Sequence, residues 1–161
     1  TLVLPIISLM IGGILFGWAK PVPIEPKNFK HKRRDLILVS LAGSVANLLM
    51  AFAWAFLAKF TFSASNFSTG GPLLALHLMG QFGITINLFI LLFNLLPIPP
   101  LDGSQILAAL LKPATAYRYQ QIAPYGIFIL FALIFIGALN TLIGIPFSIL
   151  HNLINLIVGL P

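Results

Sequence analysis

The sequence predicts an all-α, polytopic transmembrane helix bundle. Of the 161 residues, 59% are hydrophobic and 7% are charged, whereas soluble domains carry about 25% charged residues. The mean hydropathy is +1.04, and the apolar residues are gathered in long runs. A water-exposed surface cannot be built from this composition, so lipid must meet the outside of the fold. Soluble globular, disordered and collagen-like classes are excluded.

The apolar runs set the number of expected spans. A helix that crosses a bilayer needs about 20 apolar residues at a rise of 1.5 Å each. Five runs come close to that length, and the first of them is short. We therefore expect five spans, at Leu2–Trp18, Leu36–Phe60, Leu73–Leu96, Ile122–Leu139 and Leu142–Leu160.

Proline and polar residues predict the connections between these spans. The segment 20–35 holds three prolines, which favour an extended loop over a helix. The segment 61–71 is polar and uncharged, and prolines break the helix end at 97–103. Asn140 and Thr141 are expected to form the turn between the last two spans.

The positive charges predict the orientation in the membrane. Six of the nine basic residues lie between Lys20 and Arg34, beside apolar runs, which favours a membrane-surface role over nucleic-acid binding. Counting spans places the loop 20–35 and Asp102 on one side, with eight of the nine basic residues there and Lys59 on the other. By the positive-inside rule this side is the cytoplasm. We expect a multi-pass protein of the cell membrane.

The chain has three acidic residues, and their sequence surroundings indicate different roles. Glu25 and Asp35 lie among the basic residues of the loop, where they neutralise neighbours. Asp102 instead follows a long apolar span within the proline-broken stretch. An acid at a membrane boundary is costly without a partner, so it indicates either a functional polar pocket or a simple Asp-Gly turn. Asn94, at the end of the same span, either binds a peptide backbone or bridges two helices.

Three blocks of sequence resemble the site-2 protease family of intramembrane zinc metalloproteases, in its compact branch. Residues 94–103 match the pattern Asn-x-x-Pro-x-Pro-x-x-Asp-Gly. Residues 16–23 resemble the block Gly-Trp-Ala-Lys-Pro-Val-Pro, and Arg33-Arg34-Asp35 follow it. Residues 42–47 are similar to Ala-Gly-Pro-x-x-Asn, with Ser44 where proline is usual. The blocks occur in the family's order.

The resemblance implies a zinc ion, Zn²⁺, with Asp102 as its third protein ligand. It also implies that Asn94 and Asn47 lie near the cleft, where they would bind substrate backbone or the developing oxyanion. Pro97 would end the span, and Gly103 would allow the turn that aims Asp102. Together these residues would form one part of a site that activates water for peptide hydrolysis.

The family's His-Glu-x-x-His helix, which supplies two zinc ligands and the general base, is absent from this chain. None of the three histidines is followed by glutamate. The chain also opens with Thr1 inside an apolar run. We therefore expect residues 1–161 to be a single integral-membrane domain, the C-terminal portion of the protease core, with that helix upstream and no activity in this portion alone.

The expected function is therefore hydrolysis of peptide bonds in a transmembrane protein or peptide near the cytoplasmic face. Two alternatives stay open. One is a non-catalytic relative that binds membrane proteins and keeps the fold without the metal. The other is a small transporter or channel subunit, in which broken helices and an intramembrane acid also occur.

Overall fold

The protein is all-α in the residues that the computed structural model describes, which are 31–64 and 71–160. This part contains six α-helices and one short 3₁₀ helix. In chain order they are α2 (Lys32–Ala64), α3 (Pro72–Asn94), α4 (Asp102–Leu110), α5 (Pro113–Gln120), η3 (Ala123–Tyr125), α6 (Gly126–Phe135) and α7 (Ala138–Val158). The predicted fold class is confirmed.

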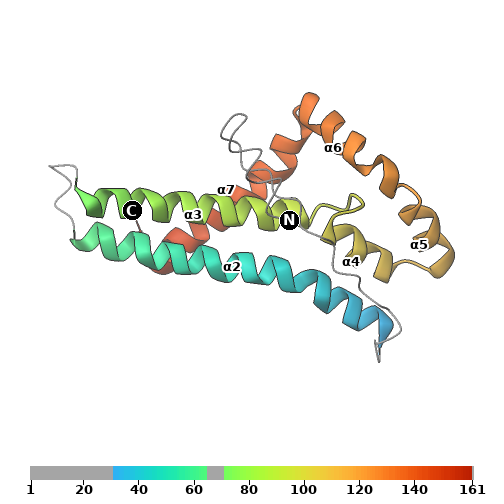
Figure 1. The fold of residues 1–161 in the computed structure, drawn as a ribbon, viewed down its shortest axis with the longest axis horizontal. Coiled ribbons are helices and arrows are strands. Elements are labelled where there is room, and N and C mark those ends of the chain that lie inside the picture. Colours follow the sequence, from blue (N-terminus) through green and yellow to red (C-terminus); the bar gives the residue numbers. More distant parts are fainter. Residues whose placement is uncertain (1–30, 65–70, 161) are drawn as a thin grey trace, which may run out of the picture.

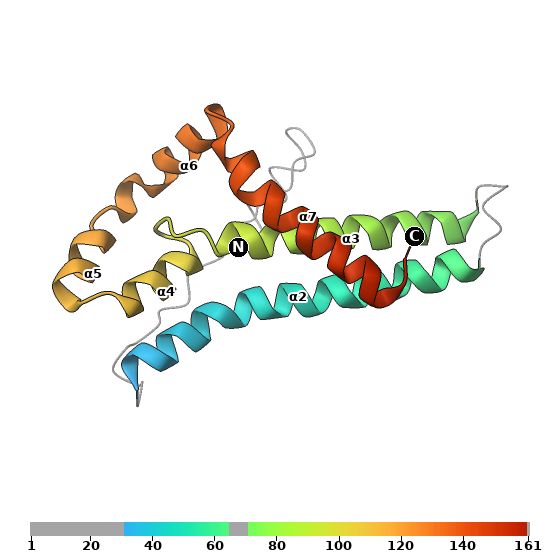
Figure 2. The same ribbon diagram turned by 180° about the vertical axis from the view of Figure 1, so that it is seen from behind.

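Helices α2 and α3 form a long antiparallel pair that runs side by side in both views (Figures 1 and 2). At a rise of 1.5 Å per residue, the 33 residues of α2 span about 50 Å and the 23 residues of α3 about 35 Å. The start of α2 therefore extends beyond the end of α3. Helix α4 packs against this overhang (Figure 1), which places the proline-broken segment beside α2.

Small residues allow α2 and α3 to approach closely. Gly80 of α3 lies so near α2 that a Cβ on it would stand 2.8 Å from the Cβ of Ala58. Gly83 lies directly under the ring of Trp54, where no side chain would fit. Small residues serve this purpose in membrane bundles, because association there depends on close packing rather than on escape from water.

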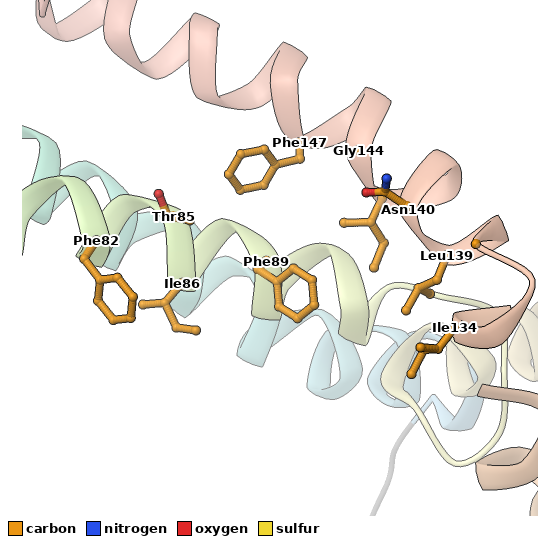
Figure 3. A pocket seen from close by; sticks show the side chains of 11 residues that line it. Phe82, Thr85, Ile86, Phe89, Ile134, Leu139, Asn140, Gly144 and Phe147 are labelled. Carbon is orange, nitrogen blue, oxygen red and sulfur yellow. The ribbon is translucent and has the colours of Figure 1, made fainter. Parts of the chain in front are cut away.

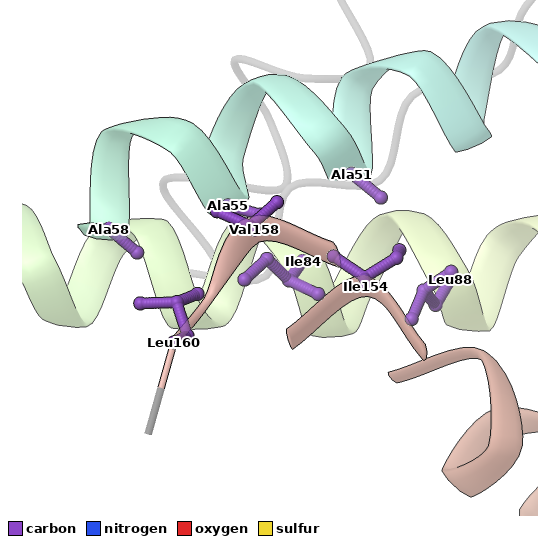
Figure 4. Packing of buried hydrophobic residues seen from close by; sticks show 8 residues of the cluster. All are labelled: Ala51, Ala55, Ala58, Ile84, Leu88, Ile154, Val158 and Leu160. Atoms are coloured by element: carbon purple, nitrogen blue, oxygen red, sulfur yellow. The ribbon is translucent and has the colours of Figure 1, made fainter. Parts of the chain in front are cut away.

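Helix α7 crosses the α2–α3 pair obliquely and completes the core (Figure 2). Its buried Ile154 and Val158 pack on the alanine face of α2 and on α3 (Figure 4). The cluster consists of Ala51, Ala55, Ala58, Ile84, Leu88, Ile154, Val158 and Leu160. The Lys59 ammonium donates a hydrogen bond of 2.5 Å to the Val158 carbonyl oxygen. A cation there complements the negative end of the α7 dipole and ties α7 to α2.

The prediction of five spans is wrong. Three helices of the described part are long and apolar enough to cross a membrane, at Arg33–Ser63, Pro72–Asn94 and Ala138–Val158. The predicted first span, 2–18, lies outside the described residues. The predicted fourth span, 122–139, is interrupted: α6 has ten residues, or about 15 Å, which is half of a hydrocarbon core.

The turn after α6 also differs from the prediction. Gly137 has φ 75°, in the left-handed region that glycine adopts without steric cost, and it separates α6 from α7. Asn140 and Thr141, the expected turn residues, lie inside α7. Hydropathy does not reveal this turn, because the apolar run continues through it.

The end of the basic loop is helical rather than extended. Helix α2 begins at Lys32, so the last four residues of the predicted loop 20–35 form its first turn. The Asp35 carboxylate accepts a hydrogen bond of 3.0 Å from the backbone N–H of His31. Asp35 thus satisfies a backbone donor that has no partner inside the helix. Glu25 lies outside the described residues.

Candidate metal and substrate site

The segment between α3 and α4 holds the predicted site residues. Helix α3 ends at Asn94, three residues before Pro97, and α4 begins at Asp102. The intervening residues turn through backbone hydrogen bonds from Ile98 N–H to Leu96 O, 2.8 Å, and from Leu101 N–H to Ile98 O, 2.9 Å. Proline lacks the donor that a continuing helix needs, so the break falls where the sequence predicts it.

Asp102 is the first residue of α4, where the helix dipole favours a negative charge. Its Oδ2 atom lies 3.6 Å from the point that a Cβ on Gly43 of α2 would occupy. Within the part of the chain that the structure describes, the half-buried carboxylate has no ion-pair or hydrogen-bond partner. Burial raises the pKa of the Asp102 carboxyl above its ordinary value. A partly desolvated carboxylate is thus left open to a cation.

Two of the three sequence blocks therefore meet in space. Asp102 belongs to the run 94–103, and Gly43 belongs to the run 42–47. More than fifty residues separate them in sequence, and the packing of α4 on α2 brings them together. The third block, 16–23, lies outside the described residues.

Gly103 lies in a close backbone contact between α4 and α3. A Cβ on Gly103 would stand 2.6 Å from the carbonyl oxygen of Leu96 and still closer to that of Leu95. The glycine is needed because α4 begins directly against the last carbonyls of α3. Its backbone is not left-handed, since among the described residues only Gly137 and Gly159 have positive φ.

The two predicted asparagines lie on the helices that border this region, Asn47 on α2 and Asn94 on α3. Asn47 lies one helical turn beyond Gly43 on α2, so the two share a face of the helix. Asn94 is the last residue of α3. Both side chains are half-buried, and neither forms a hydrogen bond with another described residue. Their contact with substrate stays a prediction.

Sequence reasoning missed several residues that hold the site together. Ser104 Oγ donates to the Leu101 carbonyl oxygen, 2.6 Å. The Tyr119 hydroxyl donates to the Pro97 carbonyl oxygen, 2.7 Å, although 22 residues separate them. No local pattern could reveal that contact, because it depends on how α5 folds back.

Ser44 is a further residue whose place only the structure shows. It is 4% exposed, and its Oγ has no hydrogen-bond partner among the described residues. The sequence did carry a signal at this position, since Ser44 replaces the usual proline of the block. Ser44 directly follows Gly43 on α2, and its hydroxyl is a buried polar atom close in sequence to the residue that faces Asp102.

The described residues do not form a complete set of metal ligands by themselves. No group of three or more His, Cys, Asp or Glu residues lies together in 31–64 and 71–160. His77 Nδ1 lies 2.9 Å from the Ala58 carbonyl oxygen, which joins α3 to α2, and His151 Nδ1 accepts from Asn155 at 3.4 Å. A catalytic zinc takes three protein ligands. Asp102 fits one of these places by its chemistry and its position.

A separate cavity of about 450 Å³ lies between α3 and α7 (Figure 3). Aromatic side chains form much of its wall, including Phe82, Phe89 and Phe147. Its polar lining is sparse, and Asp102 is not part of it. This cavity is suited to apolar groups and not to a metal ion.

Comparison with known proteins decides the family. The profile of Peptidase family M50 matches residues 71–137, which contain α3, the broken segment, Asp102 and the helices up to α6. The chain belongs to peptidase family M50. This is the family to which the site-2 proteases belong, so the resemblance drawn from the sequence is confirmed.

Two curated M50 relatives can be compared with this chain over different lengths. It is 37% identical over 145 residues to "Putative zinc metalloprotease YwhC" of Bacillus subtilis, which covers 87% of this chain and 63% of that protein. It is 38% identical over 69 residues to "Putative zinc metalloprotease MJ0611" of Methanocaldococcus jannaschii, covering 43% of this chain and 31% of that protein. The chain thus spans less than two thirds of either relative. No solved structure matches this M50 chain.

Proposed function

We propose that this chain is the C-terminal portion of a zinc metalloprotease that hydrolyses peptide bonds of membrane-embedded substrates. M50 membership and the names of the two relatives support the reaction class. Three long apolar helices support a multi-pass membrane location. The observation that carries the proposal is the meeting of Asp102 with Gly43, because it unites two of the family's blocks around one carboxylate.

Asp102 is the metal ligand of this proposal. Its carboxylate has no competing partner among the described residues and stands at the N-terminus of α4. Pro97 lies in the segment that ends α3, and Gly103 lets α4 start against the Leu95 carbonyl. When bound, zinc supplies Lewis-acid activation of water and of the peptide carbonyl. The chain's own part is to hold one oxygen donor in place.

Asn94 and Asn47 are proposed to bind the substrate. Amide side chains can donate to a peptide carbonyl and accept from a peptide N–H, so they can hold an unwound stretch of a transmembrane segment. Their amides also suit a developing oxyanion, which gains most from donors that are already in place. Their half-buried positions on α2 and α3, near the α4 contact, support this role.

The rest of the zinc site is proposed to lie outside this sequence. The three histidines are at positions 31, 77 and 151, and none begins a His-Glu-x-x-His motif. Two zinc ligands and the general base must then come from elsewhere, and this portion alone would be inactive. Sequencing the transcript upstream of the codon for Thr1 tests this directly. An apolar helix with that motif supports the protease, and a degenerate motif supports the non-catalytic relative.

The site is proposed to face the cytoplasm. The first turn of α2 and helix α5 carry basic residues at one end of the structure, whereas Lys59 lies near the C-terminus of α7 (Figure 1). Asp102 lies toward the same end as α5, because α4 packs on the N-terminal part of α2. By the positive-inside rule that end is cytoplasmic.

The decisive experiment compares two acid-to-amide variants of the full-length protein. Asp102→Asn removes the charge of the proposed ligand, and Asp35→Asn is the matched control on an acid that caps α2. We expect Asp102→Asn to lose bound zinc and cleavage of a membrane substrate, with Asp35→Asn unchanged in both. Metal content is measured by elemental analysis. Wild-type zinc in Asp102→Asn would refute the ligand role, and a metal-free wild-type protein would favour the non-catalytic relative.

A further inference from the structure

Residues of α5 and α6 contact the segment 97–102, which connects α3 to α4 and ends at Asp102. The Tyr119 hydroxyl donates to the Pro97 carbonyl oxygen at 2.7 Å. Gly126, the first residue of α6, lies against the backbone of Pro99, so close that a Cβ on it would stand 2.7 Å from the Pro99 carbonyl carbon. Two points of the segment are thus fixed by residues that follow it in the chain.

These contacts matter because little else ties α5 to the helix bundle. Helix α5 packs on α4, and it has no comparable packing against α2, α3 or α7 within the described residues. None of its residues is buried. The hydrogen bond from Tyr119 is therefore a direct link between α5 and the residues just before Asp102.

The Tyr119 hydroxyl is suited to this link. Its acceptor is a carbonyl that the broken helix leaves without an intrahelical partner, because the residues after Pro97 do not continue α3. A phenol of ordinary pKa, about 10, is protonated and can donate at neutral pH, and burial raises the pKa of Tyr119 above that value. Tyr117, two residues earlier, is 67% exposed and points elsewhere on the same helix.

We propose that Tyr119 is a positioning residue that orients the segment 97–102 and thereby the zinc ligand Asp102. The proposal rests on the proposed function, because it needs Asp102 to bind the metal. Tyr119 acts on the ligand through the backbone of the segment and touches neither metal nor substrate. Residues that orient metal ligands set metal affinity, and their loss typically costs about 10- to 100-fold.

The test measures zinc affinity of the full-length protein by competition with a chelator, alongside kcat and KM. Tyr119→Phe keeps the ring and removes only the hydroxyl, and Tyr117→Phe is the matched control on the same helix. We expect Tyr119→Phe to bind zinc about tenfold more weakly, with kcat lowered and KM little changed. Tyr117→Phe should match the wild type in all three quantities.

Folding is followed by thermal unfolding of the metal-free proteins, and Asp102→Asn is measured in parallel. Wild-type zinc affinity in Tyr119→Phe, while Asp102→Asn has lost zinc, overturns the positioning role alone. Wild-type zinc in Asp102→Asn overturns the proposed function and this inference with it. A metal-free Tyr119→Phe protein that is already unfolded also overturns the inference, because the hydroxyl would then hold the fold and not the ligand.

Discussion

The contact between the start of α4 and the end of α3 can be tested by adding a single methyl group. Gly103→Ala places a Cβ 2.6 Å from the Leu96 carbonyl oxygen and nearer still to that of Leu95. Real Cβ atoms do not approach other heavy atoms within 3.0 Å. Since both neighbours are backbone atoms, no side chain can rotate away, and α4 must move from the Leu95 carbonyl oxygen by about 0.9 Å to reach that limit.

The energetic consequence follows from this displacement. Overpacking of a close contact typically costs about 1–3 kcal/mol, and a backbone clash belongs at the upper end of that range. The shift also moves Asp102, the neighbour of Gly103, and a misplacement of about 1 Å at a reacting centre can cost about 100-fold in rate. We therefore expect Gly103→Ala to lower the free energy of unfolding by about 2–3 kcal/mol and to reduce zinc content.

The assay is thermal and denaturant unfolding of the full-length protein in detergent, with zinc content measured on the same samples. Gly144→Ala is the matched control, because Gly144 lies within α7 and a Cβ on it would be 3.9 Å from its nearest neighbour, Asn140 Oδ1. That variant should be as stable as the wild type or up to about 1 kcal/mol more stable. Unfolding and zinc content of Gly103→Ala equal to those of Gly144→Ala would refute the argument.

Two further predictions concern the rest of the bundle. Lys59→Met removes the ammonium that caps the Val158 carbonyl, and we expect the free energy of unfolding to fall by about 1–2 kcal/mol. The control is Lys112→Met, at a surface lysine, and equal stability of the two variants would contradict the prediction. Because the chain holds no cysteine, Arg118→Cys and Ser63→Cys can each report topology singly. A membrane-impermeant maleimide should label position 63 from outside intact cells and position 118 only after lysis, and labelling of both from the same side would refute the orientation.

The sequence predicted candidate site residues, and the structure added their geometry. The pattern 94–103 is local: prolines remove backbone donors wherever they occur, so the end of α3 before Pro97 follows from the sequence itself. Asp102 was a candidate because a carboxylate beside a long apolar run is energetically costly unless it has a partner. Its approach to Gly43 and the hydroxyl of Tyr119 could not be found in this way, because both contacts join residues that are far apart in the chain.

What the sequence by itself determined is the class of protein, and it also predicted which residues carry the chemistry. Composition and run length select an all-α membrane protein, because lipid and backbone hydrogen bonding leave few other solutions. Only the tertiary structure decided that 122–139 is not a span and that Gly103 serves close packing. The left-handed turn at Gly137 and the carbonyl oxygens packed against Gly103 both depend on which helices pack together. Hydropathy does not tell which helix packs against which.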